Sequence, residues 1–234
     1  MTQSHSLVLI RHAQSTWNKE GLFTGWADPE LTEHGVEEAR EAASLLQAAG
    51  IAFDRVYCSV LSRARQTAEI ILAGLGQETL AIQQDWRLNE RHYGDLQGLN
   101  KENMAEKVGV EQVLRWRRGY EDLPPPMAED DERHPRFDAR YTNVDPALLP
   151  THENLKMTRE RVMGFWREFI IPDINRGQRV LISAHGNTLR ALLMDLHNIS
   201  PSQVETFEIP TGTPIICQFH DDQFVDWRYL QDSD

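Results

Sequence analysis

The hydrophobic pattern of the chain begins with a continuous apolar run of strand length, Leu-Val-Leu-Ile at residues 7–10. A run without polar alternation is typical of a strand buried on both faces of a parallel sheet. It stops at Arg11 and His12, because a guanidinium and an imidazole are costly to bury without partners. We therefore expect the strand to end here, at the edge of the sheet where open α/β folds bind ligands.

A second apolar run of the same kind, residues 180–184, is followed by His185, Gly186 and Asn187. We interpret it as a buried strand that ends at His185, a turn at Gly186 and Asn187, and a helix that starts at Thr188. The free backbone amides of a helix N-terminus favour a bound anion at this point. Because the carboxyl ends of parallel strands share one edge, we expect His12 and His185 to meet.

The rest of the pattern alternates between helical and strand periodicity. Apolar residues at helical spacing predict helices over 32–50 (N-cap Thr32), 59–75 (N-cap Ser59), 101–120 and 154–170 (N-cap Asn154). Short apolar runs predict strands at 55–59 and 80–82, and a hairpin of 215–220 and 224–229 around Asp221 and Asp222. These elements predict an α/β protein, a three-layer α/β/α sandwich with a mainly parallel sheet and an antiparallel edge strand.

Residues 100–150 depart from this alternation. Three prolines at 124–126 begin a polar, acid-rich stretch that runs to about Pro150 without apolar periodicity of its own. A long irregular segment in a compact domain is usually a functional loop. We therefore interpret residues 1–234 as a single domain with an insertion or lid at about 100–150, over the active face.

Composition and charge limit the classes of binding partner and the cellular location that the sequence is compatible with. The net charge of −12 argues against nucleic acid and against an anionic membrane surface. No apolar run reaches the length of a membrane span, and the first residues lack the basic region of a secretory signal. The two cysteines, Cys58 and Cys217, form no disulfide framework, and we interpret Cys58 as a core residue. These features predict a cytoplasmic protein.

Candidate chemistry gathers at the predicted carboxyl edge. Ser15, Asn18, Thr24 and Gly25 supply the small polar groups that an anion site needs, with a plain turn as the alternative for the last two. Arg63 falls in the first turn of a predicted helix, where a cation opposes the helix dipole, so either an anion lies nearby or the side chain is solvated.

Two further groups have a functional and an ordinary interpretation. Glu90 lies in a polar loop and is a candidate proton donor, unless it is merely solvated. Arg117 and Arg118 form a basic cluster that is either a solvated helix face or part of a lid closing on an anion.

Three kinds of site are compatible with a pair of histidines at one sheet edge. A metal site is disfavoured because the neighbouring arginines oppose a cation and no H-x-x-x-H motif is present. A serine hydrolase would need G-x-S-x-G after a strand, which the sequence lacks. A phosphate pocket needs arginine forks, neutral donors and a nucleophile, which these loops supply.

Four motifs, taken in order, carry a family resemblance. They are R-H followed by S-x-W-N, then S-x-L-x-R-A-x-Q-T, L-N-E-R-x-Y-G-x-L-Q-G, and A-H-G-N. With them the sequence resembles the histidine phosphatase superfamily, and within it the 2,3-bisphosphoglycerate-dependent phosphoglycerate mutases. The resemblance extends from Leu7 to about Tyr229. It implies a mutase that interconverts 3-phosphoglycerate and 2-phosphoglycerate in glycolysis and gluconeogenesis.

The resemblance also implies roles for individual residues. His12 would be the nucleophile that carries the phosphoryl group, with Arg11, Arg63 and His185 around it and Glu90 moving the proton of the substrate hydroxyl. Substrate contacts would come from Ser15, Asn18, Thr24, Gly25, Tyr93, Lys101, Arg117, Arg118, Gly186 and Asn187. The phosphoryl donor would be 2,3-bisphosphoglycerate, without a metal, and the assembly a homodimer or homotetramer.

The chain departs from the family pattern at three places. Ala13 stands where the family usually has Gly, and Gln14 where it usually has Glu, so we expect slight crowding and the loss of one charge at the pocket. The sequence stops at Asp234, where many members continue into a mobile tail, and we expect this to affect the balance of mutase and phosphatase activity. The alternatives are a phosphohistidine-dependent phosphatase and a non-catalytic phosphate-binding protein.

Overall fold

A six-stranded sheet forms the centre of the protein, seen here in a computed structural model that describes residues 4–220 and 223–231. Its order is β3-β2-β4-β1-β5-β6, with the first four strands parallel and β5 and β6 antiparallel at one edge. The strands are β1 (Ser4–Arg11), β2 (Arg55–Cys58), β3 (Ile82–Gln84), β4 (Val180–Ala184), β5 (Pro214–His220) and β6 (Gln223–Tyr229). The predicted mixed sheet is confirmed, while its hairpin turn at Asp221 and Asp222 lies outside the described residues.

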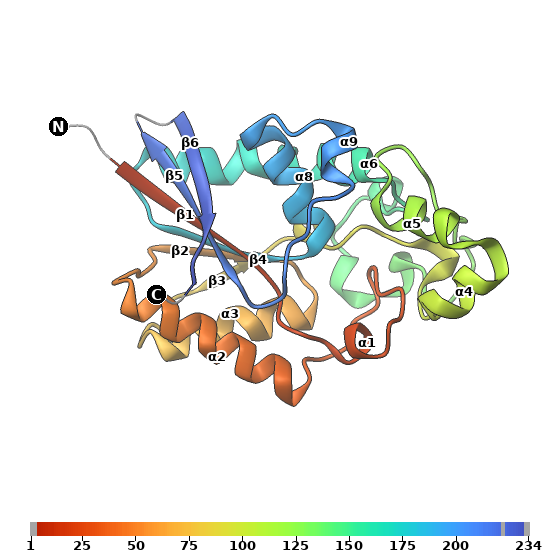
Figure 1. The fold of residues 1–234 in the computed structure, drawn as a ribbon, viewed down its shortest axis with the longest axis horizontal. Helices are drawn as coiled ribbons and strands as arrows, with labels where there is room; N and C mark the ends of the chain where they lie inside the picture. Colours follow the sequence, from red (N-terminus) through yellow and green to blue (C-terminus); the bar gives the residue numbers. More distant parts are fainter. Residues whose placement is uncertain (1–3, 221–222, 232–234) are drawn as a thin grey trace.

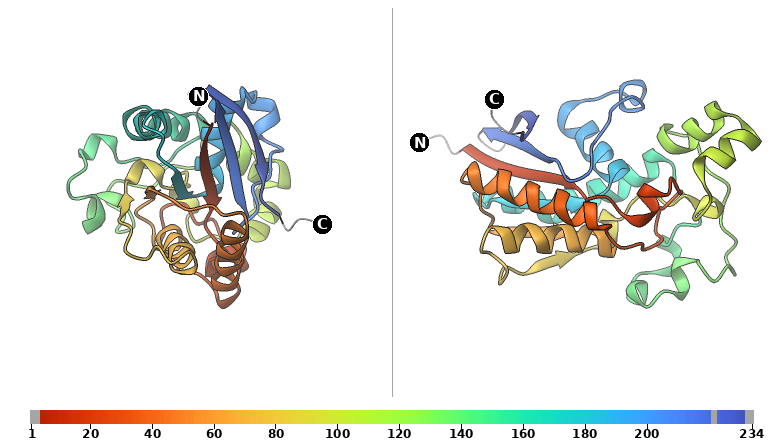
Figure 2. Two further views of the ribbon diagram at one scale, coloured as in Figure 1. Left: turned by 90° about the vertical axis from the view of Figure 1, so that its left-hand side faces the viewer. Right: turned by 60° about the horizontal axis from the view of Figure 1, so that its bottom comes forward.

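Helices cover both faces of this sheet, which gives the three predicted layers (Figure 2). One face carries α2 (Glu33–Ala48) and α3 (Ser62–Gly74), and the other carries α6 (Leu155–Phe165) and α8 (Gly186–His197). The other helical elements are α1 (Thr16–Lys19), η1 (Trp86–Leu88), η2 (Gly94–Leu96), α4 (Lys101–Val108), α5 (Val110–Arg118), η3 (Pro135–Phe137), η4 (Ala139–Tyr141), η5 (Pro146–Leu148), the π-helix η6 (Trp166–Ile170), α7 (Ile171–Asn175) and α9 (Pro201–Val204). Among the described residues, none of the helices has the length and apolar character needed to span a bilayer.

The continuous apolar run of β1 is explained by burial on two sides. Leu7 and Leu9 pack with the helices α6 and α8, whereas Val8 and Ile10 pack with α2 and α3. All four side chains are fully buried. Since successive strand side chains point to opposite faces, a strand between two helical layers needs apolar residues at every position. Each such side chain contributes about 2 kcal/mol by leaving water.

Two predicted helix starts are wrong. Ser59 does not cap α3, which begins at Ser62 after Leu61, and the Ser62 amide donates to a carboxylate oxygen of Asp28 at 2.7 Å instead. The helix α8 begins at Gly186 rather than Thr188, so Gly186 and Asn187 form its first turn and not a separate turn. At each helix start a carboxylate from a distant loop accepts a first-turn amide, Asp28 for α3 and Glu90 for α8.

Other predicted boundaries are confirmed or shifted. Thr32 and Asn154 cap their helices as expected, each accepting a backbone N–H three residues later. The predicted helix over 101–120 is split in two by Gly109, whose φ of 91° is a conformation that glycine adopts without strain. The short third strand begins at Ile82, two residues later than predicted.

Residues 100–150 lie beyond the carboxyl ends of β1 and β4, on the side of the molecule where the loop containing α1 lies (Figure 1). They pack through two small apolar clusters. In one cluster, Val113 of α5 contacts a group that contains Phe23 and Tyr93, and in the other Tyr141 contacts Trp26. The segment is therefore held against the loops that follow β1 and η1.

Candidate active site

Two histidines meet at the carboxyl edge of the sheet. His12 follows β1 and His185 follows β4, and these neighbouring parallel strands pair Arg11 with Ala184. The ring centroids of the two imidazoles are 5.0 Å apart, and both side chains are buried. The structure thus brings together the two histidines that the strand pattern predicted to meet.

The surroundings of His12 leave one ring nitrogen available as a nucleophile. The Nδ1 atom lies 2.8 Å from the Ala13 carbonyl oxygen, which only accepts, so Nδ1 carries the proton of the neutral ring. The Nε2 atom accepts a hydrogen bond from Arg63 Nε at 3.3 Å. Burial, followed by the charges of Arg63 and Arg11, holds the pKa of His12 well below its ordinary value. The ring is therefore neutral at pH 7 with its lone pair on Nε2.

His185 lies next to this ring as a second neutral imidazole. Its Nε2 atom is 2.7 Å from the hydroxyl of Ser59, whose oxygen also accepts the Leu61 amide. Burial and the nearby charge of Arg63 hold the pKa of His185 well below its ordinary value. Its Nδ1 atom is buried and has no hydrogen-bond partner among the described residues. The described residues thus leave one nitrogen of His185 unpaired, although His185 is not part of the pocket lining.

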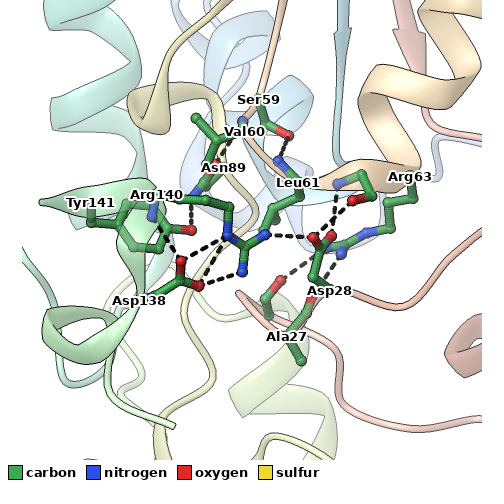
Figure 3. Close-up of polar contacts among 12 residues, drawn as sticks. Ala27, Asp28, Ser59, Val60, Leu61, Arg63, Asn89, Asp138, Arg140 and Tyr141 are labelled. Carbon is green, nitrogen blue, oxygen red and sulfur yellow. Dashed lines mark hydrogen bonds and ion pairs between the residues drawn. The ribbon is translucent and has the colours of Figure 1, made fainter.

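Arg63 is held in place by the loop that precedes it (Figure 3). Its two terminal nitrogens donate to the carbonyl oxygens of Ala27 and Gly25, both at 2.8 Å. The carboxylate of Asp28 binds the backbone and side chain of Ser62, and also pairs with Arg140. Burial lowers the pKa of Arg63 to about 10, so the group stays charged at neutral pH.

Arg11 adds a second guanidinium, half-buried, from the end of β1. Its Nη1 atom donates to the carbonyl oxygen of Ile209 at 2.8 Å, while its Nε atom has no partner among the described residues. The Nη1 atom of Arg118 is likewise buried without a hydrogen-bond partner among the described residues. Buried donors of this kind are rare in proteins unless a ligand or water satisfies them. The donors therefore fit an anion with several oxygen atoms.

Glu90 lies at the N-terminus of α8. One of its carboxylate oxygens accepts the backbone amides of Arg91 at 2.8 Å and Asn187 at 3.1 Å. Tyr93 lines the same pocket as Glu90, and its hydroxyl accepts a hydrogen bond from the side-chain amide of Asn187. Arg91 instead turns inward and donates to the Glu153 carbonyl oxygen. Neighbouring side chains of this loop thus diverge, so that Glu90 and Tyr93 line the pocket while Arg91 does not.

One pocket collects most of the predicted residues. Lys101 lies at its rim, where Nζ donates to the Leu22 carbonyl oxygen at 2.6 Å. Burial, with the charge of Arg117, lowers the pKa of Lys101 to about 8. The predicted residues that line the pocket are Arg11, His12, Asn18, Thr24, Gly25, Arg63, Glu90, Tyr93, Lys101, Arg117, Arg118, Gly186 and Asn187.

Two predicted site residues do not line the pocket. The Ser15 hydroxyl caps α1, where it accepts the Asn18 backbone amide and donates to the Asn18 side chain. His185 lies beside His12, with the ring centroids 5.0 Å apart, but is not part of the lining. Gln14 also points elsewhere, because its side-chain oxygen accepts the hydroxyl of Thr32 at the start of α2. Ala13 is buried, and its amide donates to Thr67.

Two charged residues of the lining were not predicted from the sequence. Arg190 lies on α8 one turn after Gly186. Helical spacing from the H-G-N motif is therefore the sequence signal that would have identified it. Glu208 lies in the loop before β5, and no local pattern distinguishes it from other exposed glutamates. With these additions the lining carries six cationic side chains and two carboxylates. The pocket is therefore strongly basic in an acidic chain.

Known metal-site patterns are not found in the part of the chain that the structure describes. There, His, Cys, Asp and Glu side chains form no group of three or more that could hold a metal ion. The chemistry that the pocket supports with its own groups is the binding of a multiply charged anion next to a neutral nucleophilic imidazole.

Comparison with known proteins agrees with this geometry. The model of the histidine phosphatase superfamily (branch 1) matches residues 7–144 and 125–230. The chain is 47% identical over 230 residues to a 2,3-bisphosphoglycerate-dependent phosphoglycerate mutase of Parabacteroides distasonis, covering 98% of this chain and 93% of the relative.

Solved structures share the fold. One is a putative α-ribazole-5′-phosphate phosphatase from Escherichia coli, with a TM-score of 0.73 and 23% identity over 97% of this chain and 96% of the other. Another is a phosphoglycerate mutase from Bacillus anthracis, with a TM-score of 0.69 and 20% identity over 96% and 92%. The chain belongs to the histidine phosphatase superfamily and, within it, to the family of 2,3-bisphosphoglycerate-dependent phosphoglycerate mutases.

Proposed function

We propose that this chain interconverts 3-phosphoglycerate and 2-phosphoglycerate through a phosphohistidine at His12. The single observation that carries the proposal is the buried imidazole of His12, whose Nε2 atom accepts a hydrogen bond from Arg63 in a basic pocket that Arg11 also lines. A nucleophile for phosphorus must be unprotonated, and the burial that keeps His12 neutral also strengthens the attraction of the arginines for the phosphoryl oxygens.

The first half-reaction forms a bond between His12 Nε2 and phosphorus and breaks the bond from that phosphorus to one oxygen of the priming 2,3-bisphosphoglycerate, which leaves a monophosphoglycerate. Arg11 and Arg63 stabilise the charge that spreads over the three phosphoryl oxygens in the transition state. His185 adds a neutral donor through Nδ1 when Ser59 donates to its Nε2 atom. In this proposal Glu90 delivers a proton to the leaving oxygen and takes one back when the free hydroxyl of a phosphoglycerate attacks the phosphohistidine.

The rim would bind the rest of the substrate. Tyr93, Lys101, Arg117 and Arg118 line the pocket on the side of α4 and α5, where a carboxylate or second phosphate would find donors. The unpartnered donors of Arg11 and Arg118 fit a ligand with anionic groups at two ends. When bound, 2,3-bisphosphoglycerate supplies the phosphoryl group that primes the enzyme, and the arginines neutralise charge without a metal.

A direct test is detection of the phosphorylated histidine. Wild-type protein is incubated with 2,3-bisphosphoglycerate and examined by mass spectrometry for an acid-labile phosphoryl group on His12. His12→Ala should lose both this modification and turnover of 3-phosphoglycerate. His34→Ala is the matched control, because His34 is an exposed histidine away from the pocket. Turnover in His12→Ala would overturn the assignment of the nucleophile.

The same assay separates mutase from phosphatase. Release of inorganic phosphate is measured beside formation of 2-phosphoglycerate, and the proposal requires isomerisation to be the faster process. Release that outruns isomerisation would instead favour a phosphatase with the same first half-reaction.

The proposal also includes a cytoplasmic location and a homodimer or homotetramer, for which the family resemblance is the support. Size-exclusion chromatography with light scattering tests the assembly.

A further inference from the structure

Glu208 places a carboxylate at the arginines of the pocket mouth. It binds the guanidinium of Arg118 through Nη2, and its second oxygen lies 3.6 Å from Arg190 Nη2. The two arginines are buried, whereas the Glu208 side chain is 71% exposed. The mechanism proposed above gives this carboxylate no task, and its negative charge opposes the binding of an anionic substrate.

The backbone that carries Glu208 is held on both sides by the same pocket. Arg190 Nε donates to the Phe207 carbonyl oxygen at 2.7 Å, and Arg11 Nη1 donates to the Ile209 carbonyl oxygen at 2.8 Å. The hydroxyl of Tyr229 donates to the Glu208 carbonyl oxygen at 2.8 Å. With the backbone fixed at three consecutive carbonyls, Glu208 leaves the arginines by a side-chain rotation into solvent, without movement of the loop.

We propose that Glu208 is a specificity-determining residue that competes with the distal anionic group of the substrate for Arg118 and Arg190. In the protein without substrate, the Glu208 carboxylate occupies the donors that the carboxylate or second phosphate of the substrate needs. A substrate with anionic groups at both ends displaces it, and the side chain then turns to solvent. This inference deepens the proposed function and rests on it.

The competition distinguishes anions by their reach. An anion confined to His12, Arg11 and Arg63, such as inorganic phosphate, does not meet the arginines that Glu208 occupies and gains nothing from its departure. A phosphoglycerate reaches both ends and must displace Glu208 to bind fully. Removal of the charge should therefore tighten binding of the two-ended anion selectively, and a role as a mere anchor for Arg118 predicts no such gain.

The test is the variant Glu208→Gln, which keeps a hydrogen-bond acceptor of the same size and removes the charge. Glu205→Gln is the matched control, since Glu205 is exposed three residues earlier and lies off the pocket lining. Dissociation constants for 3-phosphoglycerate and for inorganic phosphate are measured by titration calorimetry at fixed ionic strength. Thermal unfolding checks that each variant is folded.

We expect Glu208→Gln to bind 3-phosphoglycerate about tenfold more tightly, because a neutral hydrogen bond to an arginine is weaker than a charged one by roughly that factor. Its affinity for phosphate should change less than twofold, and Glu205→Gln should match wild type. Unchanged or weaker binding of 3-phosphoglycerate, or equal tightening of both ligands, overturns the inference. Failure of the proposed function is distinct, because wild-type protein would then neither bind nor isomerise 3-phosphoglycerate.

Discussion

Lys101 gives the pocket a dependence on pH that can be measured in activity. Its ammonium group lies 2.6 Å from the Leu22 carbonyl oxygen and over the ring of Phe23, and burial with the charges of Arg117 and Arg11 lowers its pKa to about 8. The group is thus mostly charged at pH 7 and mostly neutral at pH 9. A substrate anion that binds to the Lys101 ammonium therefore loses this interaction between pH 7 and pH 9.

The expected size follows from that pKa. Above pH 8, kcat/KM should fall about tenfold per pH unit, since this parameter reports ionisation of the free enzyme. The fall should end at a plateau about 10–100-fold lower, which is the cost of one lost charge-assisted hydrogen bond. The value of kcat should hold to a higher pH, because the bound anion stabilises the charged lysine.

The assay is a coupled measurement of 2-phosphoglycerate formation from pH 7 to 9.5 at constant ionic strength, a range in which the substrate phosphate stays a dianion. Lys101→Arg should remain charged and lose the fall near pH 8, whereas Lys101→Met should lie on the plateau throughout. A flat kcat/KM in wild type, or the same midpoint in Lys101→Arg, would refute the reasoning.

Two further predictions concern proton transfer and acid stability. Glu90→Gln should lower kcat about a hundredfold or more while calorimetry shows the affinity for 3-phosphoglycerate largely retained, and an unchanged kcat would remove Glu90 as the proton carrier. Burial lowers the pKa of His92 from 6.5 to about 3, so its neutral form contributes stability that is complete above pH 6.5 and declines as pH falls toward 3. The free energy of unfolding, measured with urea, should fall by about 1.4 kcal/mol per pH unit in this window for that one proton. His92→Gln should reduce the slope by that amount, and an identical slope in the variant would contradict the assignment.

Local rules in the sequence were enough for much of the fold. Two apolar runs predicted strands buried on both faces, and the contacts of β1 with two helical layers confirm this. Thr32 and Asn154 cap their helices because a cap depends only on residues within one turn. The meeting of His12 and His185 also followed from the sequence, since parallel strands that each end in a histidine present both at one edge.

Where a side chain had two possible partners, the tertiary structure decided. Ser59 has the identity of a helix cap, yet its hydroxyl binds His185, which lies 126 residues away in the chain. Asp28, from a different loop, caps Ser62 in its place. The Ser59 hydroxyl still accepts the nearby Leu61 amide, but its contact with His185 holds it before the helix, which begins three residues later at Ser62.

The chemistry of the pocket depended most on what only the folded chain contains. By itself the sequence determined which residues follow each strand and therefore which groups approach the sheet edge. Only the tertiary structure lowered the pKa of His12, directed Glu90 inward, and placed Glu208 against Arg118. The physical reason is that desolvation and the field of neighbouring charges arise when segments far apart in the sequence pack together, and no local pattern encodes either.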